Sequence, residues 1–377
     1  MTRRLVRRSV PRSVRWSVRW LGRLATVIAA FAPSPSGARS QEIPDSVVQA
    51  VDRFVEQHYE RLGLPGVAVS IATANEVVLA KGYGNGTLQG EPITNRTSFF
   101  LGSVTKTLTA FGVARLAEDG HIDLDGPVER FIPGFGMRAP FEPGMLTLRH
   151  LLHHRSGLSQ WDGHDSVAQE RGRFDHLAPT GLPGGDSEYS SLNFILLGRV
   201  VEEASGMSYG EFLDQTLFGP LGMDDAFVEG SGSRLEPRAQ GHRNLFGFNV
   251  ETDEPPVPPF LVPAGFASAS AVDMARYTGM LLGRGAFGDR RVADSATVAA
   301  LLAPMGETGP AMAWGRGRRD GTLVLGHSGN SRTSAARVRL VREDGYAISV
   351  LVNTNSGPFF DSPDALLDGI HTILDGG

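Results

Sequence analysis

Two residues in the first third of the chain, Ser103 and Lys106, have the types and the spacing that nucleophilic catalysis requires. The chain contains 36 basic residues, and only two of them, Lys81 and Lys106, are lysines. Arginine stays protonated in proteins, whereas burial can lower the pKa of a lysine until the amine releases its proton. We therefore expect a chain that otherwise uses arginine to keep a lysine where a proton must be accepted.

The spacing brings the amine to the hydroxyl if this segment is helical, because residues i and i+3 share one face of a helix. Gly102 precedes Ser103, which suits a hydroxyl at a helix start, where free N–H groups and the helix dipole favour negative charge. A serine alkoxide needs such a field, an amine base and donors for the oxyanion. S-x-x-K is a short pattern, and a capping serine beside a solvated lysine is the alternative interpretation.

Further motifs follow in an order that resembles one enzyme superfamily. The segment Phe99–Ala110 resembles the first motif of the serine β-lactamase and penicillin-binding protein superfamily. It is most similar to the class C-like branch, which includes family VIII-type esterases and D-aminopeptidases. Other blocks that resemble this family are Leu116–Asp125, Leu151–Leu158 (similar to LLTHTSGL), Glu188–Asn193 (similar to Y-x-N), Pro263–Ser268, Val272–Tyr277 and Gly326–Asn330 (similar to K-T-G or H-x-G). The resemblance extends from about Ser46 to the C-terminus.

The resemblance implies a role for each motif residue. Ser103 would be the acylated nucleophile, Lys106 the base that activates it, and Tyr189 the relay that passes the proton to the leaving group. His327, Ser328 and Gly329 would line the far wall of the site. The backbone N–H groups of Ser103 and Asn330 would form the oxyanion hole. A cation beside the phenol would lower the pKa of Tyr189, and the phenolate would favour the charged amine. No cofactor or metal is implied.

Two positions depart from the family pattern. Ser191 replaces the asparagine of Y-x-N, which implies a weaker grip on a substrate amide. His327 replaces the lysine of K-T-G and is mostly neutral at pH 7, so a permanent charge for a substrate carboxylate is absent there. Both changes favour an esterase or a D-amino-acid amidase or peptidase over a β-lactamase. The expected substrate is a small ester, amide or peptide.

Hydrophobic periodicity predicts the elements that would position these residues. Helices are expected over 46–61, 103–118, 193–205, 271–282 and 362–374, and strands over 67–72, 76–81, 322–325, 335–341 and 346–353. Five prolines between Glu254 and Pro263 predict irregular structure. Strands at both ends with helices between them predict an α+β fold. We expect one domain over 41–377, with an antiparallel sheet and its helices (about 41–120 and 310–377) and an inserted helical subdomain (about 121–309).

Composition excludes several classes of protein. The chain has 377 residues, of which 20% are charged and 41% hydrophobic, so disorder throughout is excluded. It has no cysteine, so thiolate chemistry and disulfides are excluded. Residues 1–40 hold nine arginines and no acid, and without those nine the remaining 27 basic and 41 acidic residues give a net charge of −14. An acidic body argues against nucleic acid as a partner.

The first forty residues are predicted to be a targeting segment. Arginines precede a short apolar stretch, Leu24–Ala32, and small residues at Ala38 and Ser40 precede Gln41 as at a signal peptidase site. We expect a cleaved export signal, a periplasmic or extracellular location and no stable membrane insertion after cleavage. A mitochondrial transit peptide and an uncleaved anchor are the alternatives.

Two other functional hypotheses stay open. His150, His153, His154 and His164, with Asp162 and Asp165 nearby, could suggest zinc, although no H-E-x-x-H or similar spacing is present. Because Ser191 departs from its motif, a non-catalytic ligand-binding or scaffold member of the same fold is the second alternative. The oligomeric state is not predicted.

Overall fold

The computed structural model describes residues 42–376 except 88–89, 138–140, 143, 160–176, 178, 231–236, 247, 308 and 356–360. These residues belong to one compact unit, Ala38–Gly377. The targeting segment lies outside the described residues, and its assignment stays a prediction. In the part of the chain that is described, no helix has both the length and the apolar character needed to cross a membrane.

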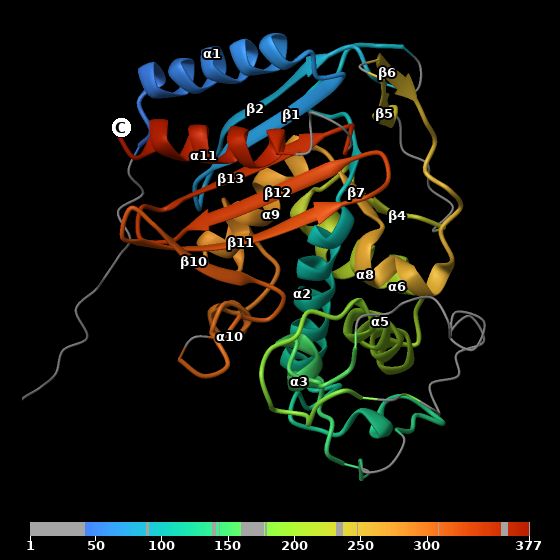
Figure 1. Ribbon diagram of the computed structural model, residues 1–377. Coiled ribbons are helices and arrows are strands. Elements are labelled where there is room, and N and C mark those ends of the chain that lie inside the picture. Colours follow the sequence, from blue (N-terminus) through green and yellow to red (C-terminus); the bar gives the residue numbers. More distant parts are fainter. Residues whose placement is uncertain are drawn as a thin grey trace, which may run out of the picture. The chain divides into compact units, whose positions relative to one another are not determined.

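An antiparallel sheet of six strands, in the order β10-β11-β12-β13-β1-β2, forms the centre of the fold (Figure 1). The strands are β10 (Gly315–Arg319), β11 (Thr322–Asn330), β12 (Ala335–Val341), β13 (Tyr346–Val352), β1 (Gly66–Ala72) and β2 (Val77–Gly84). Strand β1 pairs with β13 from Val67 opposite Val352 to Ala72 opposite Ala347. Both ends of the chain therefore contribute to one sheet, and the predicted α+β fold class is confirmed.

Helices cover both faces of the sheet. Helices α1 (Asp45–Leu62) and α11 (Ser362–Leu374) lie side by side on one face, and α9 (Ala271–Leu282) contacts β1 and β13 (Figure 1). Side chains alternate between the two faces of a strand. Accordingly Val67, Val69 and Ile71 pack with α1 and α11, whereas Ala68 joins the cluster that contains α9. Helix α9, which lies within the segment predicted to be the helical subdomain, thus packs against the sheet.

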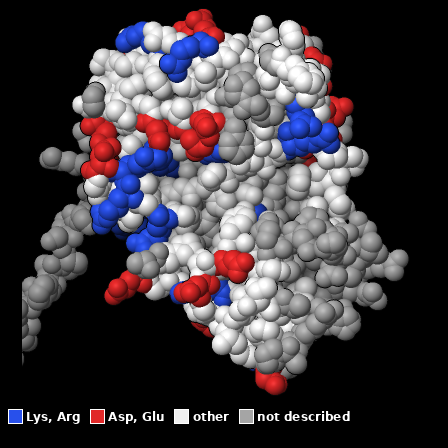
Figure 2. Space-filling model, in the orientation of Figure 1, with Lys and Arg blue, Asp and Glu red and all other residues white. Residues whose placement is uncertain are grey.

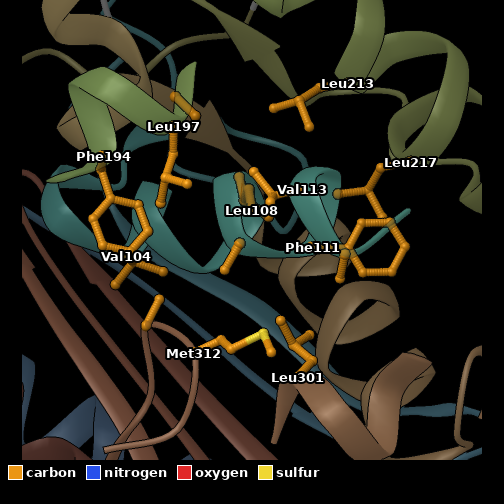
Figure 3. Packing of buried hydrophobic residues seen from close by; sticks show 14 of the residues in the cluster. Val104, Leu108, Phe111, Val113, Phe194, Leu197, Leu213, Leu217, Leu301 and Met312 are labelled. Atoms are coloured by element: carbon orange, nitrogen blue, oxygen red, sulfur yellow. The ribbon is translucent and has the colours of Figure 1, made fainter. Parts of the chain in front are cut away.

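Helix α2 (Thr105–Glu118) follows directly after the 3₁₀ turn η1 (Gly102–Val104). It runs through the hydrophobic cluster that also contains Ala68 and buried residues of α9. Its buried residues face in all directions rather than along one stripe, as expected for a helix surrounded by others. Figure 3 shows Leu108, Phe111 and Val113 of α2 enclosed by apolar side chains of other segments, including Phe194 and Leu197 of α5 (Ser191–Ser205). This packing holds the start of α2, and therefore Ser103, in a fixed position.

Shorter elements complete the fold. They are β3 (Phe99–Phe100), η2 (Val128–Arg130), α3 (Leu148–Leu152), α6 (Tyr209–Leu213), the π-helical turn η3 (Asp214–Phe218), α7 (Gly219–Leu221), β4 (Phe227–Val228), β5 (His242–Leu245), β6 (Phe248–Glu251), η4 (Pro259–Leu261), α8 (Val262–Gly265), β7 (Ala267–Ala269), β8 (Ala286–Phe287), β9 (Arg290–Arg291) and α10 (Ser295–Leu301). Strands β3, β7 and β4 form a small sheet, and β3 comes just before the turn that carries Ser103.

One expectation for the segment between β6 and β7 was wrong. The proline-rich segment from Glu254 to Pro263 was expected to be irregular, but η4 and α8 occupy its second half. Each has a proline in its first turn, at N1 or N2. Proline is tolerated there because the N–H that it lacks has no partner within the helix.

Candidate active site

The hydroxyl of Ser103 and the amine of Lys106 meet at the start of α2, as their spacing predicted. Ser103 Oγ and Lys106 Nζ lie 3.1 Å apart. The turn before them depends on Gly102, which has a φ of +52°. A Cβ at that position would overlap the backbone nitrogen of Asn330. Glycine therefore allows the chain to present Ser103 against the end of β11.

Lys106 is fully buried, with 0% of its surface exposed. Its amine also donates to the carbonyl oxygen of Ala264 at 2.5 Å and lies 5.0 Å from the centre of the Tyr189 ring. Within the described residues it forms no ion pair with a carboxylate. Burial lowers the pKa of Lys106 from 10.5 to about 7, because the charged form loses its solvation without gaining a counterion. The amine can therefore accept a proton near neutral pH.

Tyr189 completes the predicted triad. Its side chain forms hydrogen bonds with those of Ser103 and Ser191, and 44% of the residue is exposed. We expected its pKa to fall beside a cation. Instead, burial raises the pKa of Tyr189 above its usual value, and the two hydrogen bonds only partly oppose this effect. Because the Lys106 amine is itself easily neutralised, the resting pair is a neutral phenol beside a weakly basic amine, rather than a phenolate beside an ammonium.

Ser191, the first residue of α5, does not replace the missing asparagine of the motif in a simple way. Its side chain forms a hydrogen bond with Tyr189. A hydroxyl used in this way supports the phenol.

His154 is a site residue that sequence reasoning treated only as a possible zinc ligand. Its ring stacks on Tyr189 with the centres 4.6 Å apart. Its Nδ1 accepts the backbone N–H of Ser190 at 3.1 Å, which requires an unprotonated Nδ1. Burial, followed by the nearby Lys106, lowers the pKa of His154 to about 3. A neutral imidazole therefore supports the tyrosine ring, and the LLTHTSGL-like motif was the signal that could have located it.

The end of β11 forms the opposite wall, and it is pressed against the serine turn. A Cβ on Gly329 would overlap the carbonyl oxygen of Leu101 and lie 2.8 Å from the backbone nitrogen of Ser103. Only glycine fits between the two segments. This approach brings the backbone nitrogens of Ser103 and Asn330 to the same end of the site, where two N–H groups can bind an oxyanion.

His327 lies on the same wall, with its ring centre 6.3 Å from that of Tyr189. Its Nδ1 is 2.8 Å from the carbonyl oxygen of Ser328, which assigns the proton to Nδ1 and leaves Nε2 as an acceptor. Burial, followed by the nearby Lys106, lowers the pKa of His327 to about 4. The ring is neutral at pH 7 and supplies no charge for a substrate carboxylate.

A cleft of about 590 Å³ connects these groups. Its lining includes Ser103, His154, Tyr189, Trp314, His327 and Asn330. The volume is within the range that small-molecule sites occupy. A larger cavity of about 740 Å³, lined in part by Phe100, Arg238 and Glu254, contains none of the predicted site residues.

The histidines proposed as zinc ligands have structural partners where the structure describes them. His150 takes part in a capping box at the start of α3 with Thr147. His153 Nδ1 lies 2.9 Å from the carbonyl oxygen of Pro310. His164, Asp162 and Asp165 lie outside the described residues. Among the residues described, no group of three potential ligands gathers around one point.

A β-lactamase family model matches residues 51–372. The chain belongs to the β-lactamase family. It is 34% identical to penicillin-binding protein 4* of Bacillus subtilis (strain 168) over 164 residues, which is 40% of this chain and 34% of that protein. It is 24% identical to protein flp of Staphylococcus aureus (strain N315) over 318 residues, which is 82% of this chain and 63% of that protein. The chain thus spans between about a third and two thirds of the length of these curated relatives.

Solved structures of other proteins share this fold. A D-amino acid amidase from Ochrobactrum anthropi SV3, crystallised with L-phenylalanine amide, superposes with a TM-score of 0.72 at 22% identity. The match covers 88% of this chain and 99% of that one. Similarity at this level establishes the β-lactamase/transpeptidase fold, and the family and fold predicted from the motifs are confirmed.

Proposed function

We propose that this β-lactamase-family chain is a serine hydrolase that acts through an acyl-enzyme on Ser103. One observation carries the proposal: a buried amine with a pKa of about 7 lies 3.1 Å from the hydroxyl of a serine at a helix start. A solvated lysine beside a capping serine would be charged at neutral pH and could not accept the serine proton.

In the proposed acylation step, Lys106 Nζ accepts the proton of Ser103 while Oγ attacks the substrate carbonyl carbon. The C–O or C–N bond to the leaving group then breaks. Tyr189 donates its phenolic proton to that group and is reprotonated by Lys106, so that one proton has moved from the serine to the alcohol or amine product. The backbone N–H groups of Ser103 and Asn330 stabilise the negative charge on the carbonyl oxygen in between.

In the proposed deacylation step, the same groups work in the opposite direction. Tyr189 and Lys106 together accept a proton from a water molecule, which attacks the acyl carbon. The bond to Ser103 Oγ breaks, and the proton returns to that oxygen. No cofactor or metal takes part in either step.

The cleft favours a substrate acyl group without a carboxylate near the β11 wall. His327 is neutral there, and Ser191 is engaged by Tyr189. We propose short-chain carboxylic esters, with D-amino-acid amides or peptides as the second choice and β-lactams as weak substrates. The amidase from Ochrobactrum anthropi, which has the same fold, supports amides as candidates.

The test uses a fluorophosphonate probe and p-nitrophenyl esters of graded chain length on the wild type and on Ser103→Ala. We expect labelling and turnover in the wild type and neither in the variant. Equal turnover by Ser103→Ala would refute the proposal. Tyr189→Phe serves as a matched variant that keeps the nucleophile and its base.

A non-catalytic, ligand-binding member of the family is the second candidate, favoured by the departure at Ser191. It predicts a folded protein that neither reacts with the probe nor turns over any ester, but binds peptide-like ligands. A scaffold role predicts large assemblies in size-exclusion chromatography. We also propose that residues 1–40 direct export, which cleavage before Gln41 in the secreted protein would test.

A further inference from the structure

A buried arginine, Arg337 of β12, lies behind the strand end that carries the proposed oxyanion donor. Its side chain is 5% exposed. Nε and Nη2 donate to the two carboxylate oxygens of Asp364 on α11, at 2.8 and 2.9 Å. Nη1 turns toward β11 and donates to the carbonyl oxygen of Gly329 and to Asn330 Oδ1, both at 3.1 Å, and to the carbonyl oxygen of Ala336 at 3.0 Å.

The contact with Gly329 determines where the next N–H group points. The carbonyl of Gly329 and the N–H of Asn330 belong to one planar trans peptide unit, so they point in opposite directions. An arginine that holds the carbonyl on one side therefore directs the N–H to the other. The backbone nitrogen of Asn330 lies against Gly102, next to Ser103, so closely that a Cβ on that glycine would overlap it.

The charge of Arg337 adds to this orientation. A hydrogen bond from a guanidinium is stronger than one from a neutral donor, and in a buried setting it polarises the group that accepts it. A polarised Gly329 carbonyl makes the N–H of the same peptide a better donor. The bidentate contact with Asp364 fixes the guanidinium plane, which leaves Nη1 aimed at β11.

We propose that Arg337 is a positioning residue that orients and polarises the Gly329–Asn330 peptide as an oxyanion donor, with Asp364 as its anchor. The inference rests on the proposed function, since an oxyanion donor matters only if Ser103 is acylated. The effect should fall on the transition state and on tetrahedral adducts, and hardly on the binding of the ground-state ester.

The same strand offers a matched control. Arg339 lies two residues further along β12, is also buried and forms an ion pair with Asp368 of α11. It stands opposite Gly326 rather than at the Gly329–Asn330 peptide. Substitutions of Arg339 and Arg337 remove the same kind of ion pair, between a buried arginine of β12 and a partly exposed aspartate of α11. Only Arg337 contacts the Gly329–Asn330 peptide.

The experiment compares Arg337→Gln, Arg337→Lys and Asp364→Asn with Arg339→Gln and Asp368→Asn. Each is measured for kcat and KM on p-nitrophenyl acetate and for inhibition by phenylboronic acid, which forms a tetrahedral adduct with an active serine. Removing an oxyanion donor costs about 10²–10³ in kcat, and misaligning one should cost about 10- to 100-fold. We expect that loss for Arg337→Gln, with KM within about threefold of the wild type and a parallel loss of boronate affinity.

The control variants should stay within about threefold of the wild type in kcat, and Arg337→Lys should retain more activity than Arg337→Gln. If Arg337→Gln does not fold, Arg337→Lys and Asp364→Asn decide the question. The proposal is overturned if the Arg337 and Arg339 variants lose activity equally, or if the loss appears in KM alone. If the wild type is no more active than Ser103→Ala in the same assay, the proposed function itself is refuted.

Discussion

The burial of Lys106 leads to a sharp prediction for Lys106→Arg. With a pKa of about 7, half of the amines are neutral at pH 7, whereas at the ordinary value of 10.5 only about 3 in 10,000 would be. Burial thus raises the fraction of active base about 10³-fold. Arginine stays protonated, so kcat/KM on p-nitrophenyl acetate should fall about 10³-fold or more in Lys106→Arg.

The pH dependence distinguishes this explanation from a simple loss of packing. In the wild type, kcat/KM should rise between pH 6 and 8 with an apparent pKa near 7. His154 and His327, with pKa values of about 3 and 4, are already neutral in that range and cannot produce the inflexion. The assay follows p-nitrophenolate release from pH 5 to 9, with Ser103→Ala as the blank. A flat wild-type profile, or a Lys106→Arg variant that keeps a tenth of the activity, would refute the reasoning.

Three further predictions follow from the same geometry. Lys106→Met should abolish turnover but raise the thermal stability, because folding lowers the pKa of Lys106 and so makes its charged form unfavourable. In the wild type this free-energy penalty is fully present below pH 7 and disappears as the pH rises toward 10.5. The gain in melting temperature should therefore be larger at pH 6 than at pH 9. Tyr189→Phe should lower kcat about 10²- to 10⁴-fold with little change in KM, as measured by steady-state kinetics, since it removes a proton-transfer group. Gly329→Ala should lower both activity and melting temperature because its Cβ meets Leu101 and Ser103; an unchanged melting temperature would show that β11 can move away.

Short-range patterns predicted much of the fold. Helix and strand periods located β1, α9, β12 and α11 to within a residue or two, because each has long apolar runs or a clear 3.6-residue repeat. The meeting of Ser103 and Lys106 was equally predictable, since it requires only one turn of helix. The strand at the last motif was expected to end at Leu325 but runs on to Asn330, because pairing with β12 sustains it through residues of weak strand propensity.

Contacts between distant segments could not be predicted in the same way. The stacking of His154 on Tyr189 depends on how α3 packs against α5, and the reach of Arg337 to Gly329 depends on how β12 lies against β11 and α11. No local pattern encodes this packing. The pKa of Tyr189 was predicted in the wrong direction, because burial raises it by more than the hydrogen bonds with Ser103 and Ser191 lower it. The surface of the described residues carries acidic and basic side chains in neighbouring clusters on the face in Figure 2, a distribution that the overall charge of the chain does not reveal.

Acylation of Ser103 is tested by mass spectrometry of the protein after reaction with the fluorophosphonate probe. We expect one added phosphonyl group per chain, located by peptide mapping on Ser103, at a rate that follows the deprotonation of Lys106. This expectation would be contradicted by a wild type that hydrolyses esters while Ser103 stays unmodified, or by a label on another residue.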